Sequence, residues 1–305
     1  MGDHRCSAQA LMNFDDIFSD IGNFLGSDDG LLTVQDLREV LDDFAALLNH
    51  GLPRVGGLHT KIPYKEVDGH ELTLDVIVPS GSGPFPVLVY FHGGAWIWGS
   101  PLTHRKLTCR LAEQGFLTLS VDYRLAPEHP FPAGFNDCVH AIHFAANNAQ
   151  RWGGNPNDLL LAGDSAGANL AAAAAVELAN RVGAPQIQAI ALLYGVFDFS
   201  GFGETGITRL LADAYLGGQN NLATDARVSP LVAGARLPPA HIAVGSADPL
   251  IDDSNALRSV LAKAGNICDY HVYDDMPHAY LQMEFLPPVQ QSIQNIADFL
   301  HRSGT

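Results

Sequence analysis

One serine of the chain stands in a pattern typical of an activated nucleophile. Ser165 lies at the centre of Gly163-Asp164-Ser165-Ala166-Gly167, after an apolar run at 159–162 and before a helix-forming run at 168–175. A strand, a serine flanked by glycines and a helix together predict a nucleophile elbow. Glycines permit so tight a turn, and the helix directs its positive end at the hydroxyl. Because a short motif also arises by chance, the serine needs partners.

Two residues that follow predicted strands can act as the acid and the base. Asp248 comes directly after a predicted strand at 241–245, and His278 lies on a loop beyond the last predicted strand. Functional groups collect at the carboxyl ends of strands in a parallel sheet. The order Ser165, Asp248, His278 is the one expected for a serine on a strand-to-helix elbow. Asp198 is the alternative acid.

A pair of glycines follows a third predicted strand. The apolar run 85–91 ends in His92-Gly93-Gly94-Ala95. Successive glycines let the backbone approach a substrate oxygen and direct N–H groups at it. We therefore predict an oxyanion hole from the amides of Gly93, Gly94 and Ala166, with His92 anchoring the loop rather than acting as a base.

The elements that must position these residues alternate along the chain from residue 57 onward. A hairpin is predicted about Asp68-Gly69, and helical and extended stretches then alternate to the C-terminus. Such alternation predicts an α/β fold with a mostly parallel, doubly wound sheet of about eight strands. Residues 199–228 interrupt the alternation with glycines and a short apolar helix.

The N-terminal part differs from the rest. Residues 34–50 carry apolar side chains at helical spacing after a candidate N-cap, Thr33, and residues 14–25 form a weaker amphipathic stretch. We interpret 1–56 as a helical cap segment and 57–305 as the catalytic domain, with 199–228 as a cap insertion. The alternative is an ordinary packed helical hairpin.

The motifs together resemble the hormone-sensitive-lipase-like carboxylesterases, the bacterial family IV of the α/β-hydrolase superfamily. The resemblance rests on the serine and glycine motifs above, on the segment Asp122-Tyr123-Arg124-Leu125-Ala126-Pro127-Glu128, on Asp248-Pro249-Leu250 and on His278. It covers roughly residues 60 to 300. The family's glycine motif is usually His-Gly-Gly-Gly, and Ala95 departs from it. We expect the extra methyl group to narrow the pocket floor or to alter activity on esters of crowded alcohols.

The resemblance implies a serine carboxylesterase that hydrolyses short- to medium-chain acyl esters through an acyl-enzyme intermediate. An amidase or lactonase would use the same triad, and a non-catalytic small-molecule receptor of the same fold would be expected to lack the histidine. We expect an ion pair between Arg124 and Glu128, and Asp164 bonded to backbone near the elbow. The expected pocket is apolar, and its candidate lining residues are Trp96, Trp98, Tyr194, Phe197, Tyr215, Leu216, Leu250, Ile251 and Tyr280.

Composition excludes several other classes. The formal net charge of −16 argues against nucleic-acid and anionic-membrane partners, and no apolar run has the length of a membrane span. Four scattered cysteines, without a signal peptide, predict free thiols and a cytoplasmic protein. No His-Glu-x-x-His occurs, and we expect neither a metal nor a cofactor. The expected partner is a small-molecule ester, and a homodimer would form through the exposed edge of the strand 268–273.

Overall fold

A mixed eight-stranded sheet forms the centre of the molecule in this computed structural model, which describes residues 33–179, 181–203, 206–219 and 221–304. The strand order is β1-β2-β4-β3-β5-β6-β7-β8. Strand β2 is antiparallel to both of its neighbours, and all other pairs are parallel. The strands are β1 (Gly57–Val67), β2 (His70–Val78), β3 (Phe85–Phe91), β4 (Leu117–Val121), β5 (Gly154–Asp164), β6 (Ile187–Leu193), β7 (Ala240–Gly245) and β8 (Cys268–Tyr273).

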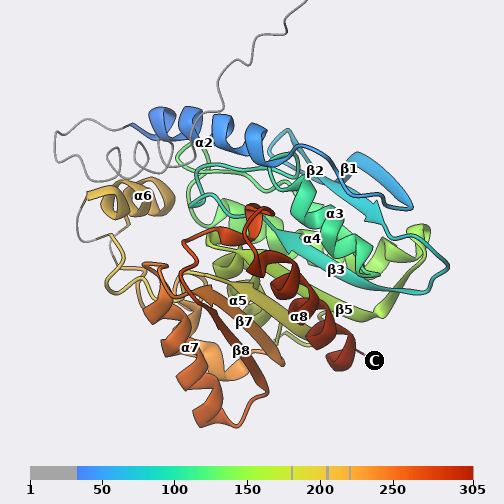
Figure 1. Cartoon of the computed structure of the whole chain (residues 1–305). Helices are drawn as coiled ribbons and strands as arrows, with labels where there is room; N and C mark the ends of the chain where they lie inside the picture. The colour runs from blue at the N-terminus through green and yellow to red at the C-terminus, as the bar shows by residue number, and fades with distance from the viewer. Residues whose placement is uncertain (1–32, 180, 204–205, 220, 305) are drawn as a thin grey trace, which may run out of the picture.

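Helices cover both faces of the sheet (Figure 1). Side chains alternate along β3: Val87 and Val89 join a core with α4, α5 and α7, whereas Leu88 and Tyr90 join a second core with α3 and α8. Burial of both faces of the sheet thus explains why β3 is apolar at every position. The covering helices are α3 (Arg105–Glu113), α4 (Ala133–Asn148), α5 (Ala166–Ala179), α7 (Ile251–Ala264) and α8 (Pro288–Ser303), with short 3-10 turns η1 (Ala149–Trp152), η2 (Pro230–Arg236) and η3 (Tyr280–Gln282).

Two further helices, α2 (Val34–Leu48) and α6 (Gly206–Leu216), contact each other at one end of the molecule (Figure 1). Thr33 begins α2 with a capping box, in which its hydroxyl and the Asp36 side chain each bond the backbone of the other residue. These helices come from the two segments that the sequence assigned to a cap. The amphipathic stretch at 14–25 lies outside the described residues.

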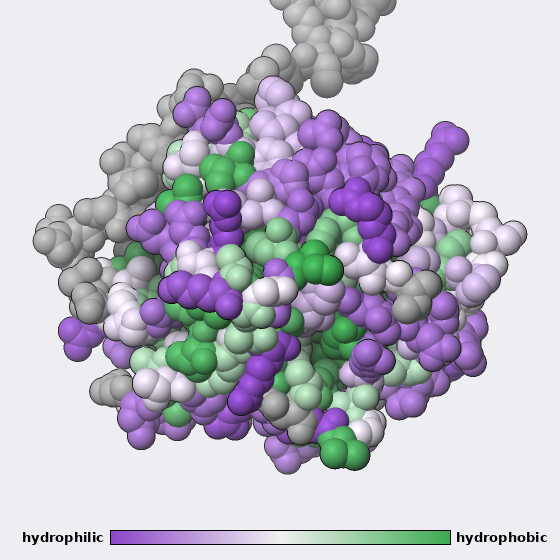
Figure 2. All heavy atoms as spheres, turned by 90° about the horizontal axis from the view of Figure 1, so that it is seen from below, coloured by the Kyte–Doolittle hydropathy of each residue, from purple (hydrophilic) through white to green (hydrophobic). Residues whose placement is uncertain are grey.

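The predicted α/β class is confirmed, and most element boundaries fall within a few residues of expectation. Strand β5 begins at Gly154, five residues before the apolar run that predicted it, because its first residues still pair with Phe85 and Pro86 of β3. None of the described helices is both long and apolar enough to cross a bilayer. On the face shown in Figure 2, hydrophilic residues surround small groups of hydrophobic ones.

Candidate active site

Ser165 occupies the turn between β5 and α5 with a φ of +52°. An L-residue rarely adopts this left-handed conformation, and here the surrounding contacts enforce it. The Ser165 N–H donates to the Leu193 carbonyl of β6 at 2.8 Å. A Cβ atom at Gly167 would collide with the Phe91 carbonyl, and one at Gly163 would collide with the backbone of Gly167. The two glycines therefore permit the close crossing of α5 over the strand ends.

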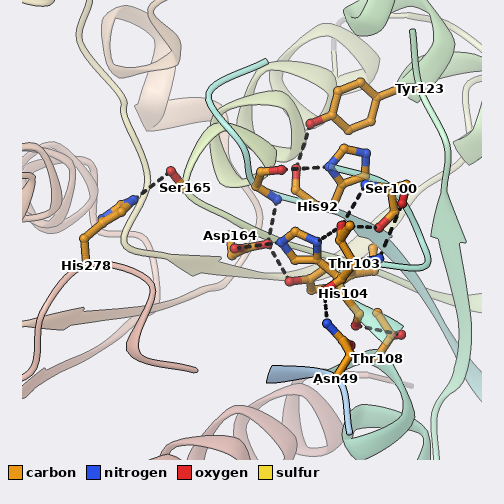
Figure 3. A network of polar contacts seen from close by, with 12 residues as sticks. Asn49, His92, Ser100, Thr103, His104, Thr108, Tyr123, Asp164, Ser165 and His278 are labelled. Carbon is orange, nitrogen blue, oxygen red and sulfur yellow. Dashed lines mark hydrogen bonds and ion pairs between the residues drawn. The ribbon is translucent and has the colours of Figure 1, made fainter. Parts of the chain in front are cut away.

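The serine, histidine and aspartate predicted from the sequence form a continuous hydrogen-bonded chain. Ser165 Oγ lies 2.9 Å from His278 Nε2, and His278 Nδ1 lies 2.9 Å from Asp248 Oδ2; Figure 3 shows the serine and the imidazole facing each other. Asp248 is 2% exposed, and its second oxygen accepts the Leu250 N–H at 2.8 Å. The Tyr194 ring and the imidazole form a T-shaped pair, with ring centroids 5.2 Å apart. The imidazole is thus held from two sides.

The alternative acid and the other histidines have different partners. Asp198 accepts bonds from the backbone and hydroxyl of Ser200, so it forms a local turn. His301 contacts the Gln114 carbonyl on α8's side of the sheet. His92 is fully buried, stacks on Tyr123 and contacts the Gly93 carbonyl, as expected of a loop anchor.

One oxyanion donor of the sequence analysis has another partner. The Gly93 N–H donates to Asp164 Oδ1 at 2.8 Å, so this hydrogen already has a protein acceptor. Gly94, Ala95 and Ala166 line the cavity beside the serine. Within the described residues, none of their three N–H groups has a backbone or side-chain acceptor. The available donors are therefore one residue further along the loop than predicted.

Ala95 takes the position of the family's last glycine in a conformation that suits glycine. Its φ is +52°, and Gly94 before it has a φ of +117°. A left-handed L-residue costs about 1–2 kcal/mol. The loop retains this conformation because the Gly94 carbonyl accepts the N–H groups of Ile97 and Trp98.

The carboxylate beside the nucleophile organises a buried polar network behind the loop (Figure 3). Asp164 is 2% exposed and accepts the Tyr90 hydroxyl at 2.6 Å as well as the Gly93 amide. His104 Nε2 lies 3.5 Å from its other oxygen. Burial raises the pKa of Asp164, but the nearby His104 and the hydrogen bonds outweigh burial and leave the pKa lowered. The predicted bond to backbone near the elbow is present, and it is made to the glycine loop.

An apolar cavity of about 330 Å³ opens above Ser165 and His278. Helix α2 contributes one wall, and α6 and the loop 94–98 contribute others. Gln282 is one of its few polar residues, and its buried Nε2 atom has no hydrogen-bond partner among the described residues. The α2 side chains that line the cavity are Leu37, Val40, Leu41, Phe44, Ala45 and Leu48.

The predicted pocket residues divide into two groups. Trp96, Trp98 and Leu250 line the cavity. The other predicted residues lie outside its lining. An aromatic or aliphatic residue near a strand end can fill the space behind the site as readily as it can line the site itself. The residues that pack in the core or begin α7 are Tyr194, Phe197, Tyr215, Leu216, Ile251 and Tyr280. Tyr215, for example, stacks on Trp96 with ring centroids 4.5 Å apart.

Sequence reasoning assigned α2 to a cap but did not identify the α2 side chains that line the cavity, and it missed Gln282. The apolar spacing of α2 identified its buried face, but a periodic pattern does not reveal that this face meets a cavity. Gln282 carries no motif, and only its position after the histidine loop hinted at a role.

Arg38 makes the largest set of hydrogen bonds from α2 to the catalytic domain, and Asp42, which accepts the Trp98 indole N–H at 2.7 Å, adds another. Arg38 donates to the carbonyls of Ile97 and Ala126 and to both oxygens of Glu128. Arg124 instead pairs with the buried Asp137 through two bonds of 2.8 Å. The expected Arg124–Glu128 pair is therefore wrong. Glu128 fixes the helix that covers the site.

The fold places the chain among the α/β-hydrolases, and comparison with known proteins agrees. A model of a family with the α/β-hydrolase fold matches residues 88–282. The carboxylic ester hydrolase LipN of Mycobacterium tuberculosis is 36% identical over 228 residues, which are 67% of this chain and 60% of LipN. The esterase LipI of the same organism is 30% identical over 297 residues, 85% of this chain and 91% of LipI.

A solved structure extends the similarity to three dimensions. An esterase of the bacterial hormone-sensitive lipase family superposes with a TM-score of 0.79 at 30% identity, over 95% of this chain and 97% of the other. The chain belongs to the hormone-sensitive-lipase family of α/β-hydrolases and is a carboxylic ester hydrolase.

Proposed function

We propose that the protein hydrolyses short- to medium-chain acyl esters whose acyl groups carry no charge, with Ser165 as nucleophile. The observation that carries this proposal is the chain of 2.9 Å contacts from Ser165 through His278 to Asp248 at the floor of an apolar cavity. A serine hydroxyl is a weak nucleophile until an adjacent base accepts its proton. The contact between Oγ and Nε2 supplies that base.

The reaction follows from these contacts. His278 Nε2 accepts the hydroxyl proton as Ser165 Oγ attacks the ester carbonyl. Asp248, bonded to Nδ1, holds the imidazole in the required tautomer and stabilises its charged form. The imidazolium then protonates the leaving alcohol, and an acyl-serine remains. Water, deprotonated by the same imidazole, releases the acid and restores the serine.

We assign the oxyanion hole to the N–H groups of Gly94, Ala95 and Ala166. All three residues border Ser165 in the cavity, and α5 begins at Ala166, so its positive end adds to the field there. A single well-placed donor contributes about 10²–10³ in rate. Ala95 can serve as well as glycine, because the donor is a backbone group.

The cavity supports a substrate of limited size and polarity. Its walls are mostly aliphatic and aromatic side chains, and its volume is about 330 Å³. An apolar wall binds an alkyl chain favourably and penalises a charged group that loses its water. We therefore infer a preference for uncharged acyl groups of short to medium length over long chains.

Replacement of the nucleophile tests the proposal. Ser165→Ala should lower kcat for a short p-nitrophenyl ester by about 10⁵-fold while the circular dichroism spectrum stays unchanged. The matched control is Ser200→Ala, which removes a hydroxyl bonded to Asp198 rather than to the triad. Turnover by Ser165→Ala at the wild-type rate would sink the mechanism. A series of p-nitrophenyl esters of increasing acyl length then measures the size preference.

Two further properties remain predictions. β8 is an edge strand of the sheet, which supports dimerisation by pairing of two β8 strands; light scattering after size exclusion measures this. Cys109 and Cys138 are buried free thiols, which supports a reducing compartment such as the cytoplasm. Fractionation of cells that express the full chain measures its location.

A further inference from the structure

We propose that His241, Asp269 and His271 form a binding site for a divalent transition-metal ion of the zinc class. One ligand atom from each residue lies within 4.8 Å of the others. None of the three residues lines the catalytic cavity. The site is therefore separate from the triad, and the proposal is independent of the proposed mechanism.

The register of two neighbouring strands brings the three side chains together. His241, near the start of β7, pairs directly with Asp269 of β8. His271 is two residues further along β8, so it projects from the same face of the sheet as Asp269. Asp248, which follows the end of β7, lies at the opposite end of that strand. The cluster is thus built on rigid, hydrogen-bonded backbone.

Both histidines are hydrogen-bonded to Asp269, at distances slightly shorter than those between neighbouring ligands of a metal, and an ion would replace these bonds. His241 Nδ1 lies 2.9 Å from Asp269 Oδ2, and His271 Nε2 lies 3.1 Å from Asp269 Oδ1. Zinc bonds of about 2.0–2.2 Å in tetrahedral geometry place neighbouring ligand atoms roughly 3.3–3.5 Å apart. Small rotations of the side chains would open the cluster enough to admit an ion.

The donor set suits a cation, because Asp269 supplies a carboxylate oxygen and the two histidines supply imidazole nitrogens. Arg302 opposes the ion, because its charge reaches His241. The Asn295 amide nitrogen lies 3.5 Å from His271 Nδ1 on the other side of the ring.

The solvent exposure of two of the three ligands gives the ion a route to the site. Asp269 and His271 are each about one-third exposed, at 32% and 33%, whereas the His241 side chain is fully buried. An ion can therefore arrive from solvent at the edge of the sheet, and water can complete its coordination. Two imidazole nitrogens and one carboxylate oxygen suit zinc, nickel or copper, whereas magnesium and calcium prefer all-oxygen sites. Such an ion would join β7 to the edge strand β8.

Calorimetric titration of Zn²⁺ into the tag-free, EDTA-treated full chain tests the site. We expect one ion per chain, a higher melting temperature with Zn²⁺, and no comparable effect of Mg²⁺. His271→Ala should weaken Zn²⁺ binding at least tenfold. Asp269→Asn should weaken it too, and it keeps the size of the side chain. His143→Ala, on α4, is the matched control and should bind as the wild type does.

Three results would overturn the proposal: no Zn²⁺ binding to the wild type, unchanged affinity in both His271→Ala and Asp269→Asn, or an equal loss in His143→Ala. Because the readout is binding and melting temperature, it holds whether or not the triad acts as proposed. If His278→Ala alone abolished binding, the ion would occupy the catalytic site, and this assignment would also be wrong.

Discussion

The Gly93 amide donates its hydrogen to the buried carboxylate of Asp164, the residue directly before the nucleophile. The oxyanion loop and the elbow are therefore tied together by one bond of 2.8 Å. Its consequence is positional: in the proposed oxyanion hole Gly93 donates nothing to the substrate, but its orientation constrains that of the next two amides. We therefore expect the buried Asp164 to govern the amides of the proposed oxyanion hole.

Removal of this acceptor should impair catalysis more than substrate binding. In Asp164→Ala, Gly93 and Tyr90 both lose their acceptor, and we expect kcat to fall about 10²-fold with little change in KM, the size of one lost oxyanion donor. Stability should fall by about 3 kcal/mol, because His104 loses its buried partner. Asp164→Asn keeps an oxygen acceptor and should retain kcat within about tenfold. Steady-state kinetics and urea unfolding measure both quantities.

Tyr90→Phe is the control for this effect. It removes the other hydrogen bond to Asp164 but leaves the Gly93 bond intact. We expect a loss of about 1 kcal/mol in stability and a nearly unchanged kcat. If Tyr90→Phe reduced kcat as much as Asp164→Ala, general destabilisation would explain the result instead of the position of the loop.

The contrast between Gly93 and the triad indicates what a sequence can predict. The proximity of Ser165, Asp248 and His278 was predictable, because parallel strands deliver the residues at their carboxyl ends to a common edge. The direction of the Gly93 N–H was not, because it depends on a side chain 71 residues away. A glycine pair reveals that the backbone is free to turn, and only the tertiary partner decides which amide faces the substrate.

The cavity shows the same limit for apolar residues. The periodicity of α2 identified Leu37, Leu41 and Phe44 as one face, and they now line the cavity. Tyr194 and Phe197 carry the same chemical signal near a strand end, yet both are completely buried in the core. Hydrophobicity predicts that a residue is buried. Whether that residue lines a cavity or packs against a neighbouring side chain depends on how whole helices and strands pack together.

Ala95→Gly should stabilise the protein without loss of rate. Ala95 has a φ of +52°, and glycine adopts this conformation without the Cβ conflict, so we expect a gain of about 1 kcal/mol in the free energy of unfolding. The backbone N–H remains, and kcat for a primary-alcohol ester should stay within about twofold. Urea unfolding and kinetics test this. A tenfold drop in kcat would show that the methyl group itself positions the substrate.

The same variant tests the size of the pocket floor. If the Ala95 methyl group restricts crowded alcohols, turnover of a tertiary-alcohol ester should rise in Ala95→Gly relative to that of its primary-alcohol isomer. Equal ratios in the wild type and the variant would contradict this restriction.

His92 should make the protein less stable as the pH falls. Burial, with a contribution from His104, lowers the pKa of His92 to about 3, whereas the unfolded chain binds the proton near pH 6.5. Between these values the unfolded state holds one more proton. Above pH 6.5, His92 therefore does not reduce the free energy of unfolding. Below it, the free energy of unfolding falls by about 1.4 kcal/mol for each pH unit towards pH 3.

Comparison of the wild type with a variant that lacks this histidine isolates the effect of His92. Burial raises the pKa of Asp122 to about 6, which acts in the opposite direction over part of the range. His92→Asn keeps a donor near Nδ1 for the Gly93 carbonyl but does not titrate. Urea unfolding from pH 4.5 to 6.5 should show stability rising less with pH in the variant than in the wild type. Identical slopes would mean that His92 binds its proton equally well in the folded and the unfolded state.

Gln282 should discriminate between leaving groups. Its buried Nε2 has no hydrogen-bond partner in the part of the chain that the structure describes. The side chain lines both the cavity and a second pocket, which contains the Lys106–Glu284 ion pair. Gln282 ends the short 3-10 turn η3, which follows His278 closely in the chain. In the proposed mechanism, His278 protonates the leaving alcohol. A substrate oxygen on the alcohol side would accept a hydrogen bond from Gln282, whereas an alkyl group would leave that amide unpaired at a cost of about 1–3 kcal/mol.

Butyl acetate and 2-methoxyethyl acetate differ in a single CH₂-to-oxygen exchange and test this directly. In Gln282→Leu, we expect the ratio of kcat/KM for the ether ester to that for the alkyl ester to fall about tenfold. Ethyl butanoate and ethyl methoxyacetate place the same exchange on the acyl side, where the ratio should not change between the wild type and the variant. A change confined to the acyl pair would place Gln282 beside the acid instead. Ratios that are the same in the wild type and the variant for both pairs would remove Gln282 from substrate recognition.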